Sequence, residues 1–153
     1  MEEKDLSDLL VDDVFTEFVV EPTVVRSGEG INKAIDAMIA NPVTRKVYII
    51  DEDGRLVGMI RTETLLRLVG YRLGVREEGA VSLLKFFRDA LKDDINEVME
   101  DAIGIRRDMP MTDALSLMIN HHLNDLAVVD EDDRLVGELS SLELFIRVRE
   151  LFP

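Results

Sequence analysis

Residues Asp51 to Ile60 read DEDGRLVGMI, and residues Asp130 to Leu139 read DEDDRLVGEL. Seven of these ten positions are identical, and the second stretch begins 79 residues after the first. A sequence that recurs at a fixed spacing indicates that one structural unit occurs twice in the chain. The duplication therefore decides the expected fold.

The repeat continues upstream of this motif. Apolar residues at helical spacing begin at Ile31 in the first copy and at Met111 in the second, 80 residues apart. The earlier stretch 11–15 resembles 95–99. A period of this length is too long for a solenoid and indicates a duplicated small domain that buries its apolar face against its twin. We divide the chain into a first motif, a bridge and a second motif, at residues 8–70, 71–94 and 95–153.

Hydrophobic periodicity predicts the same elements in both copies, in the order strand, helix, strand, strand, helix. In the first copy they are expected at 19–25, 31–39, 47–50, 55–60 and from about 62. In the second copy they are expected at 103–105, 111–120, 126–129, 134–139 and 142–151. The predicted fold class is α+β, with two tandem β-α-β-β-α motifs. Apolar spacing in the bridge predicts a further helix, which covers a sheet edge or the other copy, or serves as a dimer or lid element.

Composition excludes several classes of function. The 153 residues carry a formal net charge of −14, which repels nucleic acid and anionic lipid. The chain contains no cysteine, so neither a disulfide framework nor thiolate chemistry is available. No apolar run reaches the roughly 20 residues of a membrane span, and the first residues lack the pattern of a signal peptide. We therefore expect a cytoplasmic protein without nucleic-acid or membrane partners.

The repeated motif and its upstream helix resemble a pair of cystathionine-β-synthase-type (CBS) domains, also called a Bateman module, over nearly the whole chain. The resemblance implies that the two copies pack about a pseudo-twofold axis and leave two clefts between them. It also implies adenosyl ligands in those clefts, namely AMP, ADP, ATP or S-adenosylmethionine. CBS pairs regulate attached or associated proteins and commonly form flat dimers, so we expect a stand-alone, non-enzymatic, homodimeric sensor of an unknown regulated protein.

Members of the family place a Thr or Ser, followed three residues later by Asp, at the start of the last helix. The resemblance implies that the hydroxyl meets a ligand phosphate and that the carboxylate accepts hydrogen bonds from the ribose hydroxyls. Ser140 and Glu143 keep a variant of this pattern in the second copy. The first copy departs from it with Arg61 and Thr64, so its cleft is expected to be empty, altered or filled by Arg61.

The pair Ser140 and Glu143 also has a purely structural interpretation. A serine followed three residues later by a glutamate is the pattern of a capping box, in which each side chain bonds to the other residue's backbone at a helix start. Both interpretations hold together when no ligand is bound. The alternative to a sensor is thus a ligand-free structural module for dimerisation or docking.

A basic pair, Arg45 and Lys46, precedes the second strand of the first copy. The resemblance implies that residues there reach across the cleft to the phosphates of a ligand bound by the other copy. Cations beside a buried strand would serve a phosphate, although charges at a strand end are commonly solvated. Because Ser140 and Glu143 lie in the other copy, the crossed set predicts one working site per chain. The predicted ligand site further includes the strand residues Ile103, Gly104, Ile105, Leu126 and Ala127.

Other chemistry finds little support in the sequence. His121 and His122 are adjacent near a helix end, so they point about 100° apart and cannot chelate one metal ion together. The acidic turns at 51–53 and 130–133 lack the spacing of a calcium loop. We find no paired nucleophile and base, and we predict neither a metal site nor catalysis.

Overall fold

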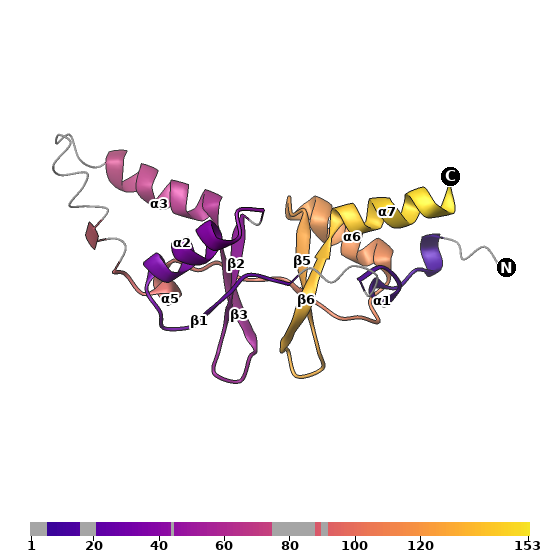
Figure 1. Ribbon diagram of the computed structural model, residues 1–153, viewed down its shortest axis with the longest axis horizontal. Helices are drawn as coiled ribbons and strands as arrows, with labels where there is room; N and C mark the ends of the chain where they lie inside the picture. Colours follow the sequence, from indigo (N-terminus) through magenta and orange to yellow (C-terminus); the bar gives the residue numbers. More distant parts are fainter. Residues whose placement is uncertain (1–5, 16–20, 44, 75–87, 90–91) are drawn as a thin grey trace. The chain divides into compact units, whose positions relative to one another are not determined.

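The structure is a computed structural model that describes residues 6–15, 21–43, 45–74, 88–89 and 92–153. The chain forms two compact units. One unit is Thr23–Ala102, and the other combines Met1–Pro22 with Ile103–Pro153. Each unit contains one copy of the repeat, and each is described separately below (Figure 1).

The first unit contains a three-stranded mixed sheet in the order β1-β2-β3. Strands β1 and β2 are parallel, and β2 and β3 form an antiparallel hairpin. The elements of this unit are β1 (Val24–Arg26), α2 (Ile31–Ala40), β2 (Lys46–Ile50), β3 (Leu56–Arg61), α3 (Thr62–Gly74) and α5 (Ile95–Val98). Helix α2 provides the crossover between the two parallel strands, as the apolar face beginning at Ile31 predicts.

The second unit repeats this arrangement with the order β4-β5-β6. Its elements are η1 (Leu6–Asp8), α1 (Val11–Phe15), β4 (Gly104–Ile105), α6 (Met111–Asn120), β5 (Asp125–Val129), β6 (Leu135–Ser140) and α7 (Ser141–Leu151). Strand β4 is parallel to β5, and β5 is antiparallel to β6. The α+β fold and the order of elements within each copy are confirmed.

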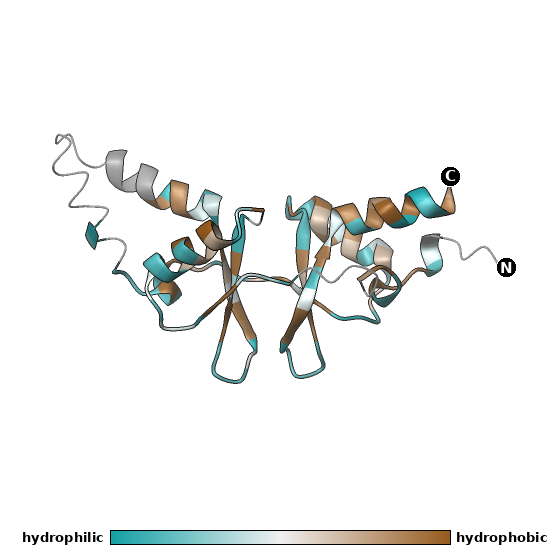
Figure 2. Cartoon of the chain, in the orientation of Figure 1, coloured by the Kyte–Doolittle hydropathy of each residue, from teal (hydrophilic) through white to brown (hydrophobic). Residues whose placement is uncertain are grey.

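The repeated motif builds the two hairpins. Asp51 accepts hydrogen bonds of 2.9 Å from the backbone N–H groups two and four residues further on, and Asp130 does the same in the other copy. The turn then needs one residue with positive φ, which is Gly54 at 82° and Asp133 at 62°. Glycine and aspartate both tolerate this conformation, which explains why the copies differ here without changing the turn. In Figure 2 these turns are hydrophilic, whereas the strands that they join are largely hydrophobic.

Apolar side chains from the sheet and the helices form the core of each unit. In the first unit the core cluster consists of Val25, Ala34, Met38, Val47, Ile49, Ile60 and Ile95. Ile95 belongs to α5, which begins the predicted second motif but packs into the core of the first unit. The segment 95–99, the lead-in segment of the second copy, is therefore a structural part of the first unit.

The corresponding segment at the start of the chain packs into the second unit. Helix α1 contacts β6 and α7, and the backbone N–H of Val11 donates to the carbonyl of Met109 at 2.9 Å. The ring of Phe15 lies over Gly137, where an added Cβ would be 2.3 Å from the ring. Met99, which follows α5, lies over Gly58 in the same way. The lead-in segment of each copy is thus exchanged with that of the other.

Two expectations need comment. The first strand of the first copy is shorter than the expected 19–25, because β1 comprises Val24–Arg26 and residues 21–23 are not in a strand. The apolar stripe predicted for the bridge falls mostly on residues 75–87 and 90–91, which lie outside the described residues. The predicted boundaries 8–70, 71–94 and 95–153 follow sequence order and stay a prediction.

Candidate functional site

The end of β6 and the start of α7 place Ser140 and Glu143 together in the second unit. The Ser140 hydroxyl oxygen accepts a hydrogen bond of 3.1 Å from the N–H of Leu142. The Ser140 N–H in turn donates to Oε2 of Glu143 at 2.9 Å. This reciprocal pair is a capping box, so the structural interpretation of the pattern is confirmed.

The capping box uses only one of the two carboxylate oxygens of Glu143. The side chain is 4% exposed, and among the described residues its Oε1 atom has no hydrogen-bond partner. Leaving a buried polar atom unpaired costs free energy, on the order of 1–3 kcal/mol. The capping box thus leaves one acceptor unpaired at this corner of the second unit, Ser140 to Glu143, and its use by a ligand stays a prediction.

Burial raises the pKa of Glu143 above its ordinary value of 4.5. The hydrogen bond from the Ser140 backbone opposes this effect, and the negative charges of Glu138 and Asp125 add to it. Glu138 is itself buried on β6. Donors from a ligand would favour the ionised carboxylate, because they replace the hydration that burial removes.

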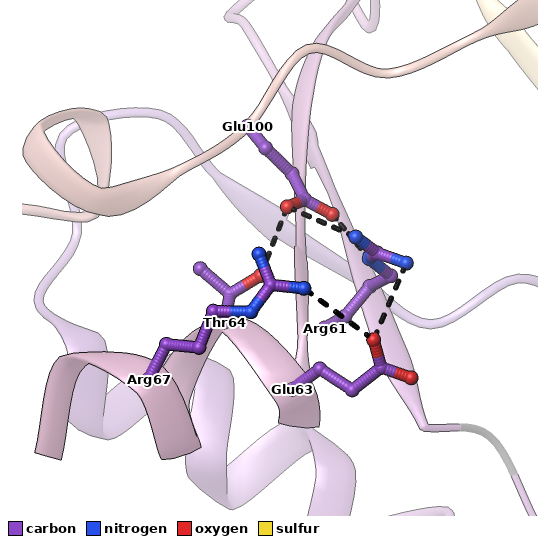
Figure 3. Close-up of polar contacts among 5 residues, drawn as sticks. All are labelled: Arg61, Glu63, Thr64, Arg67 and Glu100. Carbon is purple, nitrogen blue, oxygen red and sulfur yellow. Dashed lines mark hydrogen bonds and ion pairs between the residues drawn. The ribbon is translucent and has the colours of Figure 1, made fainter. Parts of the chain in front are cut away.

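The equivalent corner of the first unit has a different arrangement, shown in Figure 3. Arg61 ends β3 at the position that corresponds to Ser140, and Thr64 corresponds to Glu143. Both side chains bind the carboxylate of Glu100: Arg61 through Nε and a second nitrogen, and Thr64 through its hydroxyl at 3.0 Å. The hydrogen bonds from Arg61 to Glu100 and the negative charge of Glu100 raise the pKa of Arg61, and burial opposes this effect. The side chain of Arg61 is therefore engaged by Glu100 within its own unit.

The two basic residues at the start of β2 lie in different environments. Arg45 is exposed, and its carbonyl accepts a hydrogen bond of 2.9 Å from the N–H of Thr62. Lys46 is 6% exposed, and its ammonium group lies 5.3 Å from the centre of the Tyr48 ring. The sequence predicts the same role for both cations, whereas in the structure only Arg45 of the two extends into solvent. That they serve a ligand held by Ser140 and Glu143 stays a prediction.

Four of the remaining candidate residues share one sheet with Ser140, and Ile103 lies just before β4 rather than in it. Gly104 of β4 pairs with Ala127 of β5, and on the other side of β5 Leu126 pairs with Leu139 of β6. Ile105, Leu126 and Ala127 are buried, Ile103 is half-buried and Gly104 is exposed. The structure thus brings Gly104, Ile105, Leu126 and Ala127 into adjacent strands, whereas the expected strand at 103–105 begins only at Gly104. Contact of these residues with a ligand stays a prediction.

Sequence reasoning missed two acidic residues. Glu138 occupies a strand position that is Met59 in the first copy, and a charged residue at an apolar position of the repeat could have drawn attention to it. Glu100 follows Met99, where the likeness between the two lead-in segments ends. Its role depends on the exchange of these segments, which periodicity does not reveal.

Each unit also has an open pocket beside its hairpin turn. The pocket of the second unit has a volume of about 470 Å³ and is lined by Arg106, Arg107, Asp108, Val129, Asp130 and Glu131. Arg106 pairs with Asp133 at 3.4 Å, and Arg107 pairs with Asp12 at 3.2 Å. The matching pocket of the first unit, about 410 Å³, is lined by Arg26 and several carboxylates. An anionic ligand would meet nearby acidic groups in either pocket. Neither pocket is therefore a better candidate for a ligand site than the Ser140–Glu143 corner.

The described residues also limit other kinds of site. Among them, no cluster of three or more His, Cys, Asp or Glu residues could hold a metal ion. Within the same ranges, no helix has the length and apolar character needed to cross a membrane.

Comparison with curated proteins finds related segments within much longer chains. The chain is 30% identical over 132 residues to "Protein sds23" from Sclerotinia sclerotiorum, an alignment that covers 86% of this chain and 23% of that protein. The chain therefore spans less than a quarter of the length of the curated relatives that it matches.

Solved structures match over almost the full length. A CBS domain-containing protein from Thermotoga maritima is 32% identical with a TM-score of 0.73, covering 93% of this chain and 95% of that one. A CBS domain protein from Pyrobaculum aerophilum, complexed with AMP, is 18% identical with a TM-score of 0.69, covering 94% and 98%. A CBS domain pair in complex with 5′-methylthioadenosine and S-adenosyl-L-methionine is 22% identical with a TM-score of 0.62, covering 93% and 97%.

The family model described as "CBS domain" matches residues 6–71 and 93–150. These two matches contain the two hairpins and the helices that surround them. The chain therefore belongs to the CBS-domain family, as a tandem pair of CBS domains.

Proposed function

We propose that this CBS pair is a regulatory module that binds an adenosyl ligand at the Ser140–Glu143 corner and performs no catalysis. The observation that carries the proposal is the buried Oε1 atom of Glu143, which lacks a partner among the described residues. A ribose diol offers O–H donors, and a carboxylate that accepts them is an established device for holding a ribose. The diol would supply the missing hydrogen bond.

Two solved relatives support the class of ligand. One is complexed with AMP, and another with 5′-methylthioadenosine and S-adenosyl-L-methionine. These compounds share an adenine and a ribose and differ in what the ribose 5′ carbon carries. Glu143 would recognise the shared ribose, while Arg45 and Lys46 would act on a phosphate if the ligand has one. Glutamate is one methylene longer than the aspartate of the family pattern, which sets the ribose slightly further from the helix.

A thermal-shift panel of AMP, ADP, ATP and S-adenosylmethionine tests the proposal. A ligand present at 100 times its dissociation constant stabilises the folded state by about 2.7 kcal/mol. For a chain of this size we expect the melting temperature to rise by roughly 5–10 °C. Adenine alone, which lacks the ribose, is the matched negative control. If no compound raises the melting temperature at millimolar concentration, the ligand-free structural role replaces the sensor role.

We also propose that the chain forms a homodimer. Leu142 and Phe145 of α7 are 64% and 65% exposed, and Leu66 of α3 is 70% exposed. Ile146 and Leu65, which the sequence groups with them, are half-buried. Large exposed apolar residues on the final helix of each copy are typical of surfaces that a partner covers.

Light scattering at micromolar concentration is expected to give twice the chain mass of 17.3 kDa. Replacing Leu142 and Phe145 together by aspartate should yield the monomer mass, since two charges would then be buried in the interface. The exposed polar variant Ser116→Asp, on α6, is the control and should remain dimeric. A monomer mass for the unmodified chain at high concentration would contradict the proposal.

A further inference from the structure

Glu100 is held in place by the backbone on both sides of it. Its N–H and its carbonyl both bond to Met59 of β3 at 2.9 Å, so the segment after α5 forms an isolated antiparallel bridge to β3. Met99, one residue earlier, lies over Gly58, where an added Cβ would be 2.6 Å from the thioether sulfur. These contacts fix where the Glu100 side chain begins, and its carboxylate lies at the end of β3 (Figure 3).

Both oxygens of this carboxylate are used. Oε1 accepts from Nε of Arg61, while Oε2 accepts from a second Arg61 nitrogen at 3.4 Å and from the Thr64 hydroxyl at 3.0 Å. Glu63 contacts Arg61 from the other side at 3.6 Å and also lies 3.8 Å from Arg67. Two cations thus face two carboxylates. The side chains of Arg61 and Glu100 are 20% and 26% exposed, so this pair is screened less than a surface pair.

The second copy has a different residue at the sequence position that corresponds to Glu100. Phe15 is the counterpart of Met99, because the two side chains lie over the equivalent glycines of the two hairpins. The residue after Phe15 is Thr16 in the sequence, whereas the residue after Met99 is Glu100. The sequence position equivalent to Glu100 therefore carries no carboxylate in the second copy, while the Arg61–Thr64 corner is closed by its own chain.

We propose that Glu100 is an intramolecular plug, a carboxylate that occupies the Arg61–Thr64 corner and excludes soluble anions from it. Arginine binds carboxylates and phosphates with the same fork of N–H donors, so a carboxylate can take the place of a phosphate. Without the Glu100 charge, Glu63 would be the one carboxylate left in contact with Arg61 and Arg67 among the described residues, and the corner would attract an anion. The description of this corner as the counterpart of a ligand site rests on the proposed function; the exclusion of anions by Glu100 does not.

The test uses inorganic phosphate and the NMR signal of the Arg61 side-chain Nε–H group. In the unmodified chain, phosphate should leave this signal unchanged, because Glu100 occupies the donors. In Glu100→Gln, which keeps the size of the side chain and removes its charge, phosphate should shift the signal and bind at least about tenfold more tightly. Glu63→Gln is the matched control: it also removes a carboxylate that contacts Arg61, but an exposed one, and it should behave like the unmodified chain.

The proposal is overturned if phosphate shifts the Arg61 signal equally in the unmodified chain and in Glu100→Gln, or shifts it in neither. If Glu100→Gln does not fold, Glu100→Asp replaces it, since the shorter side chain retreats from Thr64 and should give a smaller shift in the same direction. A parallel titration of the unmodified chain with adenosyl compounds tests the proposed function separately. A response to phosphate in Glu100→Gln without adenosyl binding would uphold the plug and remove the sensor.

Discussion

Replacing Phe15 by alanine is expected to lower the free energy of unfolding by about 3–5 kcal/mol, the usual cost of removing a buried aromatic ring. Phe15 is 8% exposed, its ring lies over Gly137, and Arg107 lies 5.1 Å from the ring centre. The loss would be a large part of a total stability of about 5–15 kcal/mol. Urea denaturation followed by circular dichroism measures it.

A double-mutant cycle with Gly137→Ala makes this prediction specific. Alone, Gly137→Ala should cost about 1–3 kcal/mol, because the new methyl group overlaps a ring that cannot bend away. In the Phe15→Ala background the space is vacant, so the same change should cost much less. Gly58→Ala is the matched comparison, since its neighbour Met99 is flexible and can partly adjust. Strict additivity of Phe15→Ala and Gly137→Ala would mean that the ring does not pack on this glycine.

Replacing Glu143 by alanine is expected to weaken adenosyl binding by about 1.5–3 kcal/mol, the range for a hydrogen bond to a charged group. This corresponds to a dissociation constant higher by about 10- to 150-fold. The physical reason is that Oε1 of Glu143 would lose the donors of the ribose. Titration calorimetry with the tightest ligand of the panel measures the change and also the stoichiometry, for which we expect one ligand per chain.

Two controls separate ligand binding from helix capping. Glu143→Gln keeps the length of the side chain and a capping-box residue at the third helical position, so it should preserve the fold and lose part of the affinity. Thr64→Ala, at the equivalent position of the first copy, should bind normally. If Thr64→Ala and Glu143→Ala weaken binding alike, or if two equal sites titrate, the proposed asymmetry between the copies is wrong.

The affinity for the ligand should also depend on pH through Glu143. Its pKa in the folded protein lies above 4.5, and the ribose donors favour the ionised form. Lowering the pH toward 4.5 protonates the carboxylate, so the affinity for the ligand should fall. The full affinity is expected only at pH values above the raised pKa of Glu143. Adenosine is the suitable probe because it carries no phosphate that titrates in this range. In Glu143→Ala this pH dependence should disappear.

The sequence predicts the hairpins and helices well because their signals are local. The motif beginning at Asp51 contains the side chain that forms the turn, and the apolar spacing from Met111 to Asn120 matches α6 at both ends. The expected strand at 19–25 was too long because apolar β-branched residues favour extended structure whether or not a neighbouring strand pairs with them. Only Val24–Arg26 has such a partner among the described residues.

The sequence predicts that the two corners differ in their residues, but not how the side chains of each corner are arranged. The repeat aligns Arg61 with Ser140 and Thr64 with Glu143 in the sequence, and these differences indicate that the two corners differ. It could not indicate that Glu100 closes one of them, because that contact needs a backbone pairing between residues far apart in the sequence. The unpaired atom of Glu143 is likewise a property of packing, since periodicity reports which face is apolar but not which atoms are left without donors.

The exchange of lead-in segments sets an order on folding during synthesis. Residues Thr23–Ala102 form a continuous unit that can be complete as soon as they have left the ribosome. Helix α1 is translated before this unit, whereas β6 and α7, which cover its apolar residues, are translated after it. The nascent chain must therefore carry Val11, Val14 and Phe15 uncovered while the whole first unit is made. Closing a loop of that length slows folding. The second unit is therefore expected to fold after the first, and to be more prone to aggregation during synthesis.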